Sequence, residues 1–242
     1  MKKVLVLVLA ILSLAACKKV TPEQRIADIS RYFDGKTEEY TSNLKQYQGE
    51  KQIDYLHLVL AKDLGAEEIW TLDEGDRHSL IAEFPAKDAD APLAMISAPL
   101  DDPAACAAIL EVLEAFHSLK IQNRNTMRAL FYAPADSTGR NGLADMNEEL
   151  HAAEEINLFD LELSTCGAVP PHTFAIVDTP TFAQRLIDAM PPYFAPLGDY
   201  QFVQQPFDPE WPMKGTIYRY DLSPAEFQKE AAAVTVFVYL LN

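Results

Sequence analysis

The chain has 242 residues, of which 49% are hydrophobic and 23% are charged, with nine glycines and three cysteines. This composition is that of a folded globular protein, and it excludes a disordered tail, a collagen-like fibre and a disulfide-stapled miniprotein. The net charge of −16 also argues against nucleic acid as a partner, because a surface this acidic repels phosphate backbones.

The first 16 residues have the features of an export signal. Lys2 and Lys3 precede an apolar run, residues 4–16, that is shorter than the roughly 20 residues needed to span a membrane. The run ends in Leu14-Ala15-Ala16-Cys17, which resembles the bacterial lipobox. The resemblance implies cleavage before Cys17, lipidation of its thiol, a short tether over residues 17–21 and an outer-membrane lipoprotein facing the periplasm. An ordinary signal with an accidental cysteine is the alternative.

The predicted elements of the first half begin with a helical stretch over residues 22–64, which starts at Thr21-Pro22-Glu23 and stops at Leu64-Gly65. Short strands follow at His78–Phe84 and Leu93–Ser97. Pro103–Leu119 is the clearest helix, because a proline occupies its first turn and apolar residues recur on one face.

The second half continues the alternation of strands and helices. Strands are predicted at Met127–Tyr132, Ile156–Leu163 and Phe174–Val177, and helices at Asn141–Glu154 and Thr181–Met190. Residues 191–212 hold six prolines and predict a long ordered loop, and Ser223-Pro224-Ala225-Glu226 has the capping-box pattern of a last helix. The order predicts one α/β domain over residues 22–242, with a mixed, mostly parallel sheet and helices on both faces.

Two cysteines lie inside this predicted domain, Cys106 and Cys166. An exported protein can form a disulfide, but the 60 positions between them do not establish the geometry that a disulfide needs. A bridge and two separate thiols both remain open at this point.

Five landmarks occur in one fixed order: Asp76–Phe84, Leu93–Ser97, Asp101–Glu111, Met127–Tyr132, and Asp221–Phe227 followed by an Ala/Val-rich helix. The third is similar to the segment Asp-Asn-Ala-Ser-Gly-Val-Ala-Ala-Leu-Leu-Glu of the zinc aminopeptidase and glutaminyl cyclase family (metallopeptidase family 28). Because all five landmarks occur in this order and spacing, residues 55–242 resemble this family. The resemblance implies a zinc-exopeptidase-like fold.

The family's chemistry uses two zinc ions held by histidines and carboxylates, with a glutamate as general base. Carried over by position, Asp101 falls on the bridging aspartate, with Asp102 as a one-residue alternative, and Asp136 and Asp160 fall on two further acidic ligands. The departures are a missing histidine near Ser97, Ala135 at the general-base position, and Arg219 where the late histidine is expected. Alanine accepts no proton and a guanidinium ligates no cation, so the two-zinc mechanism should not operate.

We therefore expect a catalytically inactive pseudo-peptidase with no cofactor. The competing hypothesis is a divergent hydrolase or cyclase in which Asp101, Asp136 and Asp160 hold one hard cation such as Ca²⁺ or Mg²⁺. His172, in Pro170-Pro171-His172, is placed so that it could reach the same cleft. The remaining interpretation is that the three carboxylates are leftover polar residues, one of them neutralised by Arg219 or Arg140.

Aromatic residues are concentrated between Pro191 and Tyr220. In the resembled family this region builds the rim of the substrate pocket, which makes Trp211, Tyr218 and Arg219 candidate binding residues; packing of the loop onto the domain is the alternative. The expected function is a lipid-anchored binding or scaffold module, with the membrane and either peptides or envelope proteins as partners.

Overall fold

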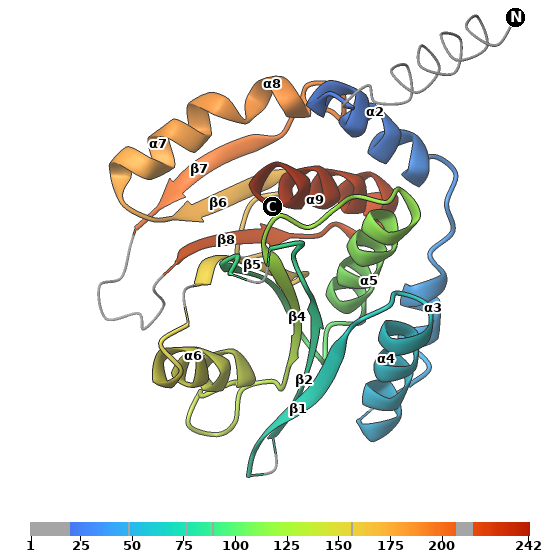
Figure 1. Cartoon of the computed structure of the whole chain (residues 1–242), viewed down its shortest axis with the longest axis vertical. Helices are drawn as coiled ribbons and strands as arrows, with labels where there is room; N and C mark the ends of the chain where they lie inside the picture. Colours follow the sequence, from blue (N-terminus) through green and yellow to red (C-terminus); the bar gives the residue numbers. More distant parts are fainter. Residues whose placement is uncertain (1–19, 48, 76, 89, 156, 207–214) are drawn as a thin grey trace, which may run out of the picture.

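The computed structural model describes residues 20–242 apart from 48, 76, 89, 156 and 207–214 (Figure 1). Its helices are α2 (Pro22–Phe33), α3 (Glu39–Leu44), α4 (Glu50–Lys62), α5 (Pro103–Ser118), α6 (Gly142–Ala152), α7 (Pro180–Ala189), α8 (Pro191–Phe194) and α9 (Phe227–Leu241), with a 3₁₀ turn at Pro224–Glu226. Its strands are β1 (Glu68–Glu74), β2 (Arg77–Phe84), β3 (Leu93–Pro99), β4 (Thr126–Tyr132), β5 (Asn157–Ser164), β6 (Thr173–Val177), β7 (Gln201–Gln205) and β8 (Thr216–Asp221).

The eight described strands form one mixed sheet in the order β1-β2-β4-β3-β5-β8-β6-β7. The central strands β4, β3, β5 and β8 are parallel neighbours, β6 pairs antiparallel to β8 and parallel to β7, and β2 joins β1 and β4 by antiparallel pairing. The carboxyl ends of the four central strands therefore lie along one edge of the sheet, together with the start of β6. The architecture is a single α/β domain with a mostly parallel sheet, as the alternation of elements predicts.

Helices cover both faces of this sheet, but unequally. The larger core lies on the face covered by α5 and α9, where α2 and α4 add further buried side chains. A smaller core, formed by Ile81, Met95 and Leu130 of the sheet and by Leu143 and Met146 of α6, lies on the opposite face. Figure 1 shows α6 apart from the group of α2, α5 and α9.

Local sequence explains the best-defined helix. The Asp102 side chain accepts a hydrogen bond from the Ala105 backbone N–H at 3.0 Å, and Pro103 occupies the first turn. Proline is favoured there because the first backbone N–H groups of a helix have no intrahelical partner. The predicted start of the first helix is confirmed too, since Thr21 and Gln24 form a reciprocal capping box at α2.

Three predictions from local pattern are wrong. The stretch 22–64 is three helices, interrupted where Gly35 and Gly49 adopt positive φ angles of 74° and 57°. Ser223 makes no side-chain cap; its backbone N–H donates instead to the Glu230 carboxylate at 2.6 Å. Residues 191–205, expected to be loop, contain α8 and β7, whereas 207–212 lie outside the described residues.

Strands β1 and β8 are additional to the predicted elements. None of the helices in the described part of the chain is both long enough and apolar enough to cross a membrane.

Candidate functional site

The loops that follow β3 and β4 meet at the carboxyl edge of the parallel strands, and α3 and α4 close the opposite side. Together they line a cavity of about 720 Å³. In open α/β sheets ligands bind outside the carboxyl ends of the strands, so this cavity is the primary candidate site. Its apolar lining comes from both sides: Leu44, Tyr47, Ile53, Leu100, Pro103, Ala133, Pro134 and Ala135.

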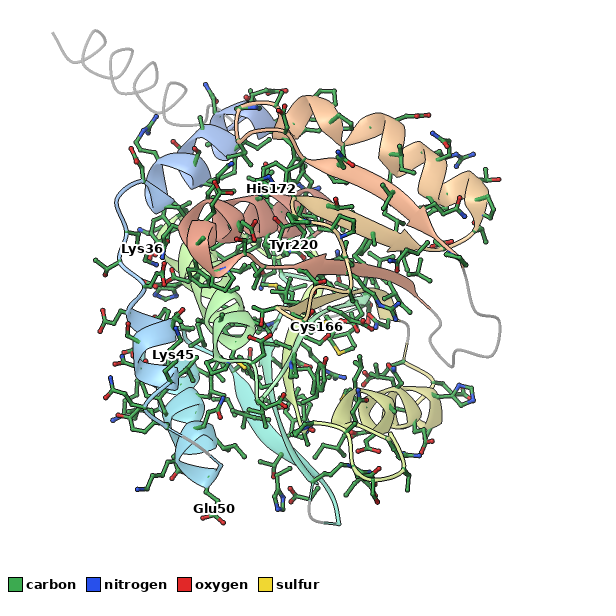
Figure 2. All side chains as sticks on the ribbon, turned by 180° about the vertical axis from the view of Figure 1, so that it is seen from behind. Lys36, Lys45, Glu50, Cys166, His172 and Tyr220 are labelled. Carbon is green, nitrogen blue, oxygen red and sulfur yellow. The ribbon has the colours of Figure 1, made fainter. Side chains whose placement is uncertain are left out.

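Charged groups lie among these apolar side chains. Lys45 and Glu50 contribute from the side of α3 and α4 (Figure 2), and Arg77, Asp101 and Asp136 from the side of the sheet. His78 is the one histidine that lines the cavity, and its Nδ1 lies 2.7 Å from Asp73 Oδ1. The cavity therefore combines an apolar lining with charges of both signs.

Asp136 is fixed by the loop in which it lies. Its Oδ1 accepts hydrogen bonds from the backbone N–H of Thr138 at 2.8 Å, from the Thr138 hydroxyl at 2.6 Å and from the Arg140 backbone at 3.2 Å, while Arg77 pairs with Oδ2. The hydrogen bonds from Thr138 are the main reason that the pKa of Asp136 is lowered. This carboxylate is consequently a structural acceptor in a turn, and it stays ionised.

The loop after β3 separates its two aspartates. Asp101 is exposed and lines the cavity. Asp102 caps α5 with Oδ1, and its Oδ2 accepts hydrogen bonds from the Thr165 backbone at 2.7 Å and from the Thr165 hydroxyl at 2.8 Å. Asp102 thus ties the loop after β3 to the loop after β5, which leaves Asp101 as the residue available to a ligand.

Asp160 lies in the middle of β5, and its side chain is fully buried. Its Oδ1 accepts a hydrogen bond from the Ser97 hydroxyl at 2.9 Å, and its Oδ2 is buried without a hydrogen-bond partner. Burial, followed by repulsion from Glu162, raises the pKa of Asp160 well above its ordinary value. Asp160 therefore belongs to the interior of the sheet rather than to the cavity.

Glu162 is a residue that the sequence analysis missed. It lies two positions nearer the carboxyl end of β5 than Asp160, and its Oε2 accepts a hydrogen bond from Arg219 Nε at 2.8 Å. Burial raises the pKa of Glu162, and Arg219 opposes that rise. The register of β5 and β8, which pairs position 162 with position 219, could not be read from the sequence.

The remaining predicted residues have different surroundings. Tyr218 is 1% exposed and packs edge-on against Phe159 and Phe237, with ring centroids 5.9 and 4.9 Å apart, so it is part of the core. Described aromatics of the same region pack around Phe174 in the same core, namely Phe194, Tyr200, Phe202 and Tyr220. This arrangement supports packing for these residues, whereas Trp211 and Cys17 lie outside the described residues.

Asp101, Asp136 and Asp160 do not converge as a metal-ligand set. Within the described residues, the one group of three His, Cys, Asp or Glu side chains whose ligand atoms all lie within 4.8 Å of one another is His172, Glu226 and Glu230. His172 therefore joins α9 instead of the three aspartates. Cys106 is a buried free thiol and Cys166 an exposed one, so the two cysteines are not bridged.

Comparison with known proteins identifies the fold. No family model matches the chain, and no curated protein matches it in sequence. Among solved structures it is similar to LapB from Legionella pneumophila, with a TM-score of 0.63 and 11% identity over 93% of this chain and 76% of LapB. A putative zinc-dependent exopeptidase from Bacteroides vulgatus has a TM-score of 0.57 and 12% identity over 83% of this chain and 93% of its own. A glutaminyl cyclase from an Acidobacteriales bacterium has a TM-score of 0.57 and 10% identity over 91% of this chain and 94% of the cyclase.

The fold is therefore of the zinc-exopeptidase class. Its particular likeness is to the aminopeptidase and glutaminyl cyclase type. The zinc that such folds hold does not suit the side chains around the cavity: its one histidine is paired with Asp73, Asp136 is held by Arg77, and Asp160 is buried in the sheet. No reaction step through zinc follows from these residues.

Proposed function

We propose that this protein is a lipid-anchored, non-catalytic binding module that holds peptides in the cavity between α3, α4 and the loops after β3 and β4. The observation that carries the proposal is the cavity itself. It lies where α/β folds bind their ligands, yet Ala135 occupies the position that the family resemblance assigns to the general base, and the candidate aspartates form no metal-ligand group.

The lining suits a peptide with an apolar or aromatic side chain. Leu44, Ile53 and Leu100 can bury such a side chain, and ligand pockets are typically apolar with a few polar groups that orient the ligand. Asp101 is exposed at the same cavity and supplies a carboxylate for an N–H or an amino group. One solved structure of similar fold is named a putative zinc-dependent exopeptidase, and this name supports a peptide as the ligand class for a cavity at this edge of the sheet.

The anchor is proposed from Cys17 and the lipobox-like sequence before it. The first described helix begins at Pro22, so four residues, 18–21, would connect the acylated Cys17 to the folded domain. One lipid chain binds a membrane only weakly, and a multiply acylated cysteine anchors stably. The outer membrane is the proposed location, with the domain in the periplasm.

Peptide binding is tested by titrating the purified protein with a panel of short fluorescent peptides and measuring anisotropy. Ala135 is exposed and lines the cavity, so Ala135→Trp places a bulky side chain in it and should weaken binding at least tenfold. Ala152→Trp is the matched control, because Ala152 is also exposed but lies on α6, and it should leave binding unchanged. Equal effects of the two variants, or no binding by the wild type, would refute a site in this cavity.

Catalytic inactivity is tested with aminoacyl and glutaminyl substrates in the presence of Zn²⁺, Ca²⁺ or Mg²⁺. We expect no turnover above the uncatalysed rate. Turnover that disappears in an Asp101→Asn variant would establish the divergent enzyme instead.

The anchor is tested separately: Cys17→Ser should move the protein from the membrane fraction to the soluble fraction, and unchanged fractionation would exclude lipidation at Cys17.

A further inference from the structure

Three metal-ligating side chains come together at the far end of the carboxyl edge, away from the residues that line the cavity. His172 ends the loop that precedes β6, while Glu226 and Glu230 lie one helical turn apart where α9 begins. Because β6 runs antiparallel to β8, pairing Phe174 with Tyr220, the start of β6 lies beside the end of β8. The chain then passes directly from β8 into the turn that carries Glu226.

The three ligand atoms are spaced for coordination of one ion. His172 Nε2 lies 2.7 Å from Glu226 Oε2 and 3.3 Å from Glu230 Oε1. Tetrahedral Zn²⁺ with bonds of about 2.1 Å to nitrogen and oxygen separates its ligand atoms by about 3.4 Å. The 3.3 Å contact already has that separation, and the 2.7 Å contact needs to open by about 0.7 Å on the exposed side of the group.

An unpartnered buried oxygen points into this group. The Glu230 side chain is 0% exposed, and its Oε2 accepts the Ser223 backbone N–H at 2.6 Å. Its Oε1, which faces His172, has no hydrogen-bond partner. Burying an ionised oxygen without a partner is costly, and a bound cation would provide that partner. Tyr220 is a buried residue of the adjacent strand that Figure 2 labels with His172, and burial, followed by the charge of Glu230, raises the pKa of its hydroxyl.

A histidine–glutamate ion pair explains only part of this arrangement. Nε2 carries at most one proton, which the 2.7 Å contact directs to Glu226, so Oε1 of Glu230 remains unsatisfied. The partial positive charge at the start of α9 favours the carboxylates, and it opposes a cation only weakly once two full negative charges are present. The side chains of His172 and Glu226 are 26% and 45% exposed, so an ion can enter from solvent.

We propose that His172, Glu226 and Glu230 form a divalent metal site of the zinc type, with one imidazole nitrogen and two carboxylate oxygens as ligands. Imidazole together with carboxylate suits Zn²⁺ better than Ca²⁺ or Mg²⁺, which prefer oxygen ligands. Three protein ligands leave a fourth position for water or an external ligand. The ion joins the loop of residues 165–172 to α9, and it is independent of peptide binding in the cavity.

The test uses the purified protein without a polyhistidine tag, titrated with Zn²⁺ against a chromophoric chelator. We expect one ion per chain. His172→Gln and Glu226→Gln should each weaken binding by at least about 100-fold, since loss of even an outer-shell partner costs 10–100-fold. Glu226 is exposed, so its variant should fold, and circular dichroism without metal verifies this.

His78→Gln is the matched control. His78 and Asp73 form a pair with the same 2.7 Å contact, and both side chains are exposed, but among the described residues the pair belongs to no three-ligand group. This variant should bind Zn²⁺ like the wild type. Cys166→Ser, which removes the exposed thiol labelled in Figure 2, should also bind normally. The proposal is overturned if the wild type holds no stoichiometric Zn²⁺, if Glu226→Gln binds as tightly as the wild type, or if a control variant loses the ion.

Discussion

The buried Asp160 is the residue at which the structure makes its sharpest prediction about stability. The substitution is Asp160→Asn, which preserves the size of the side chain and keeps an oxygen that accepts the 2.9 Å hydrogen bond from Ser97. It removes the negative charge beside Glu162, whose Oε1 is also buried without a hydrogen-bond partner. The asparagine amide carries N–H donors, whereas Oδ2 of Asp160 and Oε1 of Glu162 have no donor in the folded protein.

The expected gain in the free energy of unfolding follows from the unpartnered oxygen. Leaving a buried acceptor unsatisfied costs about 1–3 kcal/mol, so Asp160→Asn should stabilise the protein by that amount at pH 8. For a domain of this size, 1 kcal/mol changes the Tm by about 2–4 °C. The expected rise in Tm is therefore roughly 2–12 °C.

The gain should depend on pH with a defined sign. Burial raises the pKa of Asp160 well above its ordinary value, so the folded state keeps the proton to a higher pH than the unfolded state does. The unfolded state then binds fewer protons in this window, and the contribution of Asp160 to stability falls as pH rises. Asparagine does not titrate, so the advantage of the variant should be small near pH 4 and largest at pH 8.

The assay is urea unfolding followed by circular dichroism at both pH values. Asp145→Asn is the matched control: Asp145 is also buried, but it pairs with Arg77 at 3.0 Å and with Arg140. Weakening a charged hydrogen bond of this kind should destabilise the protein by about 2 kcal/mol. Loss of stability in Asp160→Asn at pH 8, or a gain of the same size at both pH values, would refute the reasoning.

Three further substitutions test the packing. Lys36→Met should destabilise the protein by about 3–5 kcal/mol in urea unfolding, because Glu111, whose side chain is 1% exposed, loses its cation. Adding Glu111→Leu should restore most of the lost stability, and an equally unstable double variant would contradict the pairing. Gly142→Ala should cost about 1–3 kcal/mol, measured as a lower Tm, since its Cβ would lie 2.0 Å from Ser79 Oγ. Thr21→Ala removes the capping box of α2 and should cost about 1 kcal/mol; unchanged stability would show that α2 does not need its cap.

Polar and edge segments show where local patterns stop being informative. β1 is mostly exposed or partly exposed along its length, so it lacks the apolar alternation that marks a strand. It is extended because every residue from Glu68 to Glu74 pairs with β2. β7 has only one buried residue, and it is likewise defined by its pairing with β6.

The sequence by itself determined the elements whose causes are local. Asp102 and Pro103 start α5, Thr21 starts α2, and the alternation of strands and helices predicts the α/β class, because capping and periodicity act over a few residues. The family resemblance also singled out Asp101, Ala135 and Asp136, and all three line the cavity.

Only the tertiary structure decided what those side chains do. Arg77 reaches Asp136 across 59 positions of sequence, and Arg219 reaches Glu162 across 57. His172 meets Glu226 across 54. Such pairings depend on sheet register and strand order, and a shift of one residue turns a side chain to the other face of the sheet. The partners of the charged residues, and with them the candidate sites, were therefore fixed by long-range packing.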